Sequence, residues 1–97
     1  MPKIIRTIPA RDDLRQVWLY TAQHNPAAAD RLIDRIERTL VSLARNPSMG
    51  ELVAQYRPGL RRFTVGKYVL YYEPINGGVR LVRLLHGARE IDELFPR

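Results

Sequence analysis

Residues Leu60 to Ala88 read LRRFTVGKYVLYYEPINGGVRLVRLLHGA, and this stretch decides the fold. Runs of β-branched and aromatic residues alternate in it with turn residues, first Gly66-Lys67 and then the segment 74–78. The second turn contains Asn-Gly, which accepts the positive φ of a tight hairpin. The pattern predicts strands over 60–65, 68–73 and 79–85, and links this short predict an antiparallel meander.

The front of the chain predicts one more strand and two helices. Ile4, Ile5 and Ile8 indicate a strand over 3–8 that ends at Pro9, since proline donates no ladder hydrogen bond. Apolar residues at helical spacing predict a helix over 10–24, in which Trp18 and Tyr20 are expected to pack.

Asn25-Pro26 separates this helix from a second one, because Asn is a good N-cap and Pro suits the first helical position. The second helix is predicted from Pro26 to about Arg45. It has an apolar stripe on one face and charged residues on the other, where Asp34 and Arg38 stand at i,i+4. So short a link predicts an antiparallel helical hairpin.

These elements form one α+β domain over residues 1–97, in the order β-α-α-β-β-β-α. The helical hairpin is expected to pack on one face of a small antiparallel sheet, and the opposite face is expected to be open to a partner. The segment 46–59 is expected to be a loop, and a short last helix is expected over 89–95.

Composition excludes several classes of site and indicates a soluble, cytoplasmic protein. The 97 residues contain no cysteine, which excludes disulfides and thiolate metal sites, and two histidines are too few to hold zinc without carboxylates. No apolar run has the length of a signal peptide's core or of a membrane span. We expect neither a metal nor a cofactor.

Positive charge is concentrated in the back half of the chain. From Arg57 to Arg89, seven basic residues stand against one acid, Glu73, so this segment carries a balance equal to the net charge of +6 of the whole chain. Fourteen of the sixteen basic residues are arginine. Arginine pairs bidentately with carboxylates and phosphates, although a GC-rich genome enriches arginine equally well.

The arginines of the predicted strands lie among apolar residues. Alternation places Arg61 with Phe63 and Val65, and Arg83 with Leu81 and Leu85. Such arginines either bind an anionic partner on the open face or pair with Glu73 across the sheet. The candidate residues for binding a target or partner are Arg61, Arg62, Lys67, Arg80, Arg83 and Arg89.

Other side chains have a structural and a chemical interpretation. His86 could act as a general acid or base, but the strand end before Gly87 favours a structural role. Glu51 could serve as a base or be a solvated loop acid. The strand tyrosines could stack on bases, yet Tyr68 and Tyr72 are predicted to share the inward face with Leu70.

The order of these residues resembles ParE-type toxins of the RelE/ParE superfamily. In the front half the resemblance rests on residues 9–14, Val17-Trp18, Tyr20, Asn25-Pro26 and Ala28-Ala29. In the back half it rests on Leu43, Asn46-Pro47, Gly50, Arg62-Phe63, Tyr68, Tyr71-Tyr72 and, above all, residues 82–89. It covers nearly the whole chain.

The resemblance implies the toxin of a type II toxin–antitoxin pair, with the helical-hairpin-on-sheet fold. Such toxins are neutralised by an antitoxin whose C-terminal segment lies along the toxin. A ParD-like partner with an acidic, amphipathic segment suits a basic, partly apolar surface, and we expect a hetero-oligomer with it.

The resemblance leaves two activities open, since ParE-type toxins inhibit DNA gyrase and RelE-type toxins cleave mRNA on the ribosome. A nuclease would use Arg62 and Arg83 for the phosphate and His86 for proton transfer. No tyrosine follows Tyr72, so the proton-transfer groups of RelE-type toxins are missing. The sequence therefore favours gyrase inhibition over the alternative, a ribosome-dependent mRNA endoribonuclease.

Overall fold

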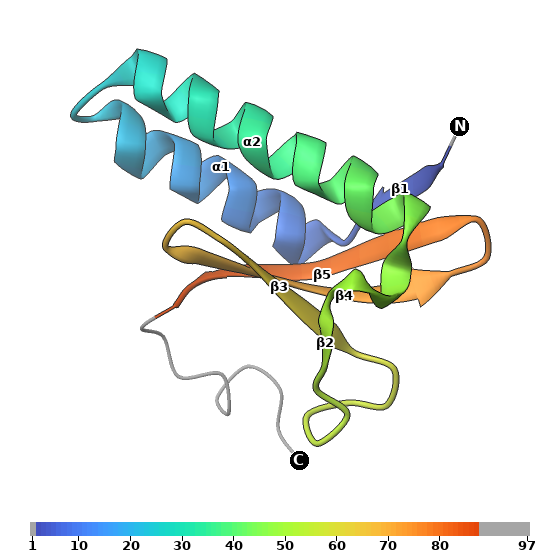
Figure 1. Cartoon of the computed structure of the whole chain (residues 1–97). Helices are drawn as coiled ribbons and strands as arrows, with labels where there is room; N and C mark the ends of the chain where they lie inside the picture. The colour runs from blue at the N-terminus through green and yellow to red at the C-terminus, as the bar shows by residue number, and fades with distance from the viewer. Residues whose placement is uncertain (1, 88–97) are drawn as a thin grey trace.

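Two helices cover one face of a five-stranded sheet in the computed structural model of the chain, which describes residues 2–87 (Figure 1). The elements are β1 (Lys3–Arg6), α1 (Ile8–Ala22), α2 (Pro26–Arg45), the 3-10 turn η1 (Pro47–Met49), β2 (Glu51–Leu52), β3 (Arg61–Val65), β4 (Tyr68–Ile75) and β5 (Gly78–His86). The predicted last helix over 89–95 lies outside the described residues. No helix within 2–87 has the length and apolarity needed to cross a membrane.

The sheet order is β1-β5-β4-β3-β2, and β3, β4 and β5 form the predicted antiparallel meander. The sheet as a whole is mixed, because β1 pairs with β5 in parallel. Lys3 stands opposite Gly78, where an added Cβ would lie 1.7 Å from the Lys3 carbonyl oxygen. The close approach of β1 therefore requires a glycine at this position.

The first strand is two residues shorter than predicted because Thr7 caps α1. The Thr7 Oγ1 accepts a hydrogen bond of 3.1 Å from the Ala10 N–H, and Pro9 lies in the first turn. A threonine cap followed by proline starts a helix as well as it ends a strand. Asn25 caps α2 in the predicted way, accepting from the Ala28 N–H at 3.1 Å.

The main core lies between the helices and the sheet. Tyr72 is fully buried there with Ile36, Leu40 and Leu70, as predicted, and Tyr68 packs against the same cluster. Burial raises the pKa of the Tyr72 hydroxyl, which donates to the Pro47 carbonyl at 2.7 Å and accepts from the Gly50 N–H at 2.8 Å. This tyrosine therefore fixes the segment that leads from α2 into β2.

The prediction of an open second face is wrong. Val53 and Leu60, at the two ends of the loop before β3, are buried with Tyr71, Val82 and Leu85 in a second apolar cluster. The Val53 N–H donates to the Leu60 carbonyl at 2.8 Å and closes the base of this loop. The two-residue strand β2, which pairs with β3, was not predicted and lies in the segment expected to be a loop.

Candidate functional site

A row of polar side chains crosses the sheet. In the strand register, Glu51 stands opposite Arg62, Arg62 opposite Tyr71, and Tyr71 opposite Arg83. Asp13 of α1 continues the row beyond β5. We call these five residues the polar row; it brings together two of the three predicted nuclease residues, Arg62 and Arg83, on either side of Tyr71.

The strongest contact of the polar row joins α1 to β5. The Arg83 Nε donates to Asp13 Oδ2 at 2.7 Å and the Nη2 to Oδ1 at 2.9 Å, in a bidentate pair whose side chains are 21% and 11% exposed. The hydrogen bonds to Asp13 raise the pKa of Arg83 above its ordinary value, against a smaller opposing effect of burial. The Arg83 guanidinium is thus held in place, and its bidentate face is already bound by the Asp13 carboxylate.

A β-bulge at Val82 makes this pair possible. Tyr72 stands opposite Leu81 and Tyr71 opposite Arg83, so Val82 is the extra residue. Among residues 2–87, no strand pairs with this edge of β5 beyond Arg6. Instead the Thr7 hydroxyl donates to the Val82 carbonyl at 2.8 Å. The bulge breaks the alternation, so Leu81 lies in the main core rather than on the predicted shared face with Arg83, whereas Leu85 does share that face.

At its other end the row is exposed to solvent. Arg62 Nη2 donates to Glu51 Oε1 at 3.0 Å, and the side chains are 36% and 63% exposed. Hydrogen bonding to Glu51 is the main reason why the pKa of Arg62 is raised, and Tyr71 adds to it. Glu51 is therefore a largely exposed acid that is paired with Arg62.

The remaining sheet arginines also have internal partners. Arg61 donates to the Gly50 carbonyl at 2.7 Å, while Arg80 and Arg57 pair with Glu73 at 2.7 and 3.1 Å. Burial would raise the pKa of Glu73, but the two arginines outweigh it and hold the pKa below its usual range. The structural alternative considered for these arginines is thus realised, with Glu73 serving Arg80 and Arg57 rather than Arg61 or Arg83.

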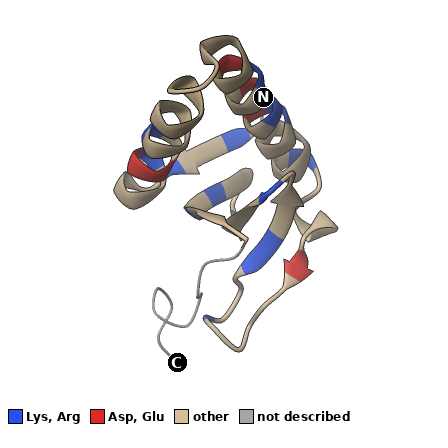
Figure 2. Ribbon diagram, turned by 90° about the vertical axis from the view of Figure 1, so that its left-hand side faces the viewer, with Lys and Arg blue, Asp and Glu red and all other residues tan. Residues whose placement is uncertain are grey.

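Basic residues occur on the helices as well as on the sheet strands (Figure 2). Of the predicted binding residues, Lys67 lies exposed in the turn between β3 and β4, and Arg89 lies outside the described part of the chain. The role of all six in binding a partner stays a prediction.

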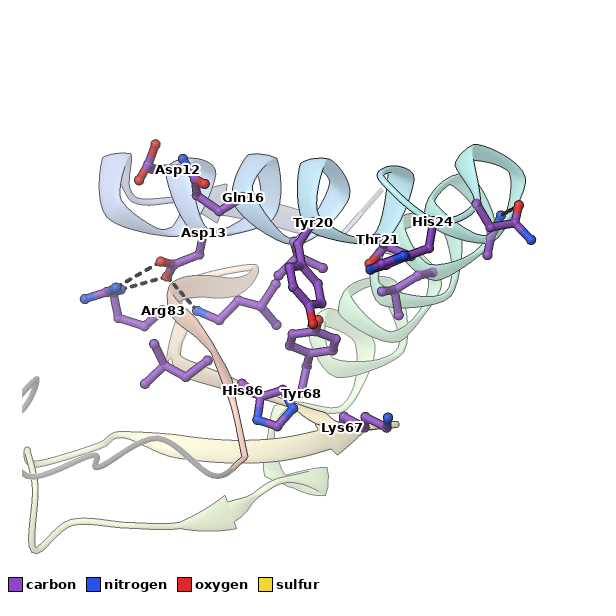
Figure 3. A pocket seen from close by; sticks show the side chains of 16 residues that line it. Asp12, Asp13, Gln16, Tyr20, Thr21, His24, Lys67, Tyr68, Arg83 and His86 are labelled. Carbon is purple, nitrogen blue, oxygen red and sulfur yellow. Dashed lines mark hydrogen bonds and ion pairs between the residues drawn. The ribbon is translucent and has the colours of Figure 1, made fainter.

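A pocket of about 880 Å³ opens between α1 and the end of β5 (Figure 3). Tyr20 and Tyr68 point toward each other across it, and the Tyr68 and His86 rings meet edge to face with centroids 5.6 Å apart. Arg83 lines one end and Lys67 another part of the rim. Because Arg62 is not among the described residues that line this pocket, His86 and the two arginines do not share one site.

The helix α1 contributes residues to the site that were not predicted from the sequence. Tyr20 is 64% exposed rather than packed, and the Trp18 Nε1–H donates to Asp30 Oδ1 at 2.9 Å at the helix surface. Asp13, Val17, Tyr20 and His24 all line the pocket. Their spacing of four, three and four residues was a readable signal for one shared face of α1.

No cluster of three or more His, Asp or Glu residues within 2–87 is arranged to hold a metal ion. The candidate site therefore consists of the polar row and the adjoining pocket.

Comparison with known proteins assigns the chain to a family. Residues 4–91 match the family described as the ParE toxin of the type II toxin-antitoxin system, parDE. Two relatives from Caulobacter vibrioides are Toxin ParE3, 32% identical over 94% of this chain and 92% of that protein, and Toxin RelE2, 34% identical over 92% and 99%. The fold is similar to a solved structure titled "Chromosomal ParDE TA system from P. aeruginosa", with a TM-score of 0.71 and 18% identity over 89% of this chain and 96% of that one. The chain belongs to the ParE toxin family of type II toxin–antitoxin systems.

Proposed function

We propose that this toxin arrests growth in the cytoplasm by inhibiting DNA gyrase, without covalent chemistry of its own, and that a cognate antitoxin neutralises it. The observation that carries the proposal is that both arginines of the polar row are already paired with carboxylates. Its two arginines, which a ribonuclease would offer to the scissile phosphate, are each engaged by a carboxylate, Asp13 or Glu51.

The chemistry of RNA cleavage explains why this occupancy matters. Cleavage through the 2′-hydroxyl needs a base, an acid and free cations close to one phosphate. To bind that phosphate, Arg83 must give up a bidentate carboxylate that is 11% exposed. His86, the candidate for proton transfer, stands opposite Tyr68 in the pocket rather than in the row.

The test is a supercoiling assay with purified toxin, gyrase and relaxed plasmid, together with a search for trapped cleavage complexes. Inhibition that rises with toxin concentration is expected, and addition of the antitoxin should restore supercoiling. Unchanged supercoiling without trapped complexes would refute gyrase as the target.

The pocket supports the antitoxin part of the proposal. Val17, Leu84 and Leu85 give the pocket an apolar part. Its charged lining residues are Lys67, Arg83, Asp12 and Asp13, and Asp13 is already paired with Arg83. An amphipathic segment of a ParD-like antitoxin fits this combination, with an apolar anchor against Tyr20 and an acidic side chain beside Lys67. The resulting complex is a hetero-oligomer.

Binding of an antitoxin C-terminal peptide, measured by calorimetry, tests this surface. Tyr20→Ala should weaken binding at least tenfold, since exposed aromatic anchors carry much of the energy of an interface. Leu19→Ala is the matched control, because Leu19 is 43% exposed but lines a different hollow with Trp18. Equal losses in both variants, or an affinity independent of salt, would contradict the proposed surface.

One observation favours the second candidate, a ribosome-dependent ribonuclease: Arg62, Tyr71 and Arg83 stand side by side in register. Tyr71→Phe removes one hydroxyl from this row and leaves both arginines. If the toxin is a nuclease, primer extension on translated mRNA should show cuts with the wild type that weaken in Tyr71→Phe. An uncut message dismisses this candidate.

A further inference from the structure

The long helix α2 carries a straight row of arginines that the activity proposed above does not use. The residues follow one another at spacings of four, three and seven, so that they lie on one face of the helix. The first and last are 14 positions apart, or about 21 Å along the helix axis. We call this set the arginine row: Arg31, Arg35, Arg38 and Arg45.

The arginine row is exposed and its guanidinium groups have no partner among the described residues. All four side chains are exposed, and no ion pair or side-chain hydrogen bond joins any of them to another part of the region 2–87. The predicted pair of Asp34 with Arg38 is absent there too. The two other acids of the helix have partners elsewhere, since Asp30 accepts a hydrogen bond from Trp18 and Glu37 pairs with Arg6.

This arrangement does not help the helix to form. Arg31 with Arg35, and Arg35 with Arg38, are like charges at i,i+4 and i,i+3, which destabilise a helix surface. Polar uncharged residues at the same positions would be more favourable for folding. The arginine row is therefore better explained by binding than by stability.

The surroundings of the row indicate the chemistry of its partner. No aromatic residue lies in the row, Ser42 occupies the remaining position of the stripe, and neither of the two described pockets is lined by its arginines. Protein interfaces gain their energy from apolar anchors in pockets, whereas phosphate contacts need only exposed cations. A polyanion of regular spacing fits this surface better than a protein does.

We propose that the arginine row binds the phosphodiester backbone of duplex DNA without reading its sequence. Each DNA strand places a phosphate about every 3.4 Å along the duplex axis, so a rigid helix of this length faces about six of them. The planar guanidinium fork binds phosphate oxygens bidentately.

The basic surface continues from α2 onto the sheet. A Cβ added at Gly66 would lie 3.6 Å from the Arg35 Nη1, so this guanidinium lies over the turn between β3 and β4. The next residue in that turn is Lys67, which is exposed. DNA lying along the arginine row can therefore meet Lys67 as well.

The test measures binding of the full chain to a fluorescently labelled 20-base-pair duplex by anisotropy, between 50 and 200 mM KCl. Four phosphate contacts give a slope of about −3.6 for log K against log salt, which is a loss of roughly 100-fold over this range. R35Q/R38Q should flatten the slope by about 2 and weaken binding at least tenfold at 100 mM salt.

R11Q/R15Q is the matched control, since it removes the same charge from exposed positions of α1. It should keep the wild-type slope, and both variants should keep the wild-type melting temperature within a few degrees. This result is independent of gyrase inhibition, because the assay contains only the toxin and DNA.

Three results would overturn the proposal. Equal losses in R35Q/R38Q and R11Q/R15Q would show that only net charge matters. Tighter, row-dependent binding of a single-stranded RNA of the same length would assign the row to RNA. An unchanged DNA affinity in R35Q/R38Q, with weakened binding of the acidic antitoxin peptide, would assign the row to the antitoxin.

Discussion

The arginines of the sheet and those of α2 differ in what surrounds them. Arg61, Arg62, Arg80 and Arg83 each have a carboxylate or carbonyl partner, whereas the arginine row on α2 has none within the described residues. Counted along the chain, the surplus of positive charge belongs to residues 57–89. In space, Arg62 and Arg83 are paired with acids from other segments, Glu51 and Asp13, and Arg61 donates to a backbone carbonyl. Charge counted along the sequence therefore does not locate an accessible cationic surface.

Removal of an acid from each region gives the largest expected contrast. Asp13→Ala leaves the largely buried Arg83 without its partner and should lower the free energy of unfolding by about 3 kcal/mol. Asp34→Ala, beside the arginine row, should change it by less than about 0.5 kcal/mol. Urea denaturation measures both. Similar losses would mean that the paired and unpaired regions do not differ energetically.

The second contrast is a pH dependence. The pKa of Glu73 is held below its ordinary value of 4.5 by Arg80 and Arg57, so its charged form stabilises the fold above about pH 4.5. This contribution is lost as the pH falls through the lowered pKa. Glu73→Gln should cost about 1 kcal/mol at pH 7 and should make unfolding less sensitive to acid below pH 4.5.

Asp34→Asn is the control for this titration, since Asp34 is exposed and has no cation paired to it within the described residues. Unfolding free energies from urea curves at pH 3 to 7 supply the comparison. An acid dependence in Glu73→Gln identical to that of the wild type would contradict the assigned ion pairs.

Exposed pairs on the sheet should matter less. Arg62→Gln removes the pair with Glu51, whose side chain is 63% exposed, so the expected cost is about 0.5 kcal/mol. High salt should reduce this difference, because the pair is exposed to solvent. A loss near that of Asp13→Ala, measured in the same denaturant series, would show that the outer end of the polar row is as tightly held as the inner end.

The smallest predicted effect has the opposite sign. R35Q/R38Q removes repulsion between neighbouring arginines of α2 and should stabilise the protein by a few tenths of a kcal/mol. Thermal unfolding at low salt is the sensitive measurement. A clear destabilisation would mean that these arginines support the fold and would remove the argument that they are kept for binding.

The predictable part of this molecule is local. Asn25 caps α2, and Asn76-Gly77 forms the hairpin before β5, where Gly77 has a φ of +86°. Such turn and cap residues act on their immediate neighbours, so the pattern gave the helices and the meander correctly. The inward positions of Tyr68 and Tyr72 followed from simple alternation.

The unpredicted part depends on contacts between distant segments. Asp13 and Arg83 are 70 residues apart, and nothing in either local pattern pairs them. The bulge at Val82 is equally hard to predict, because valine is an ordinary strand residue and the bulge lies where Thr7, not β1, contacts β5. The two-residue strand β2 is too short to leave an alternation.

Asp13 also protects the exposed edge of β5 from pairing with another chain. Past Leu81, where β1 no longer accompanies β5, its carboxylate accepts the Leu84 N–H at 2.9 Å and so occupies a donor that a foreign strand would otherwise claim. A side chain, unlike a neighbouring strand, offers no further row of amides to pair with. Loss of this one carboxylate would leave a backbone N–H unpaired at an exposed edge of the sheet. We therefore expect a chain without it to aggregate by pairing between sheet edges.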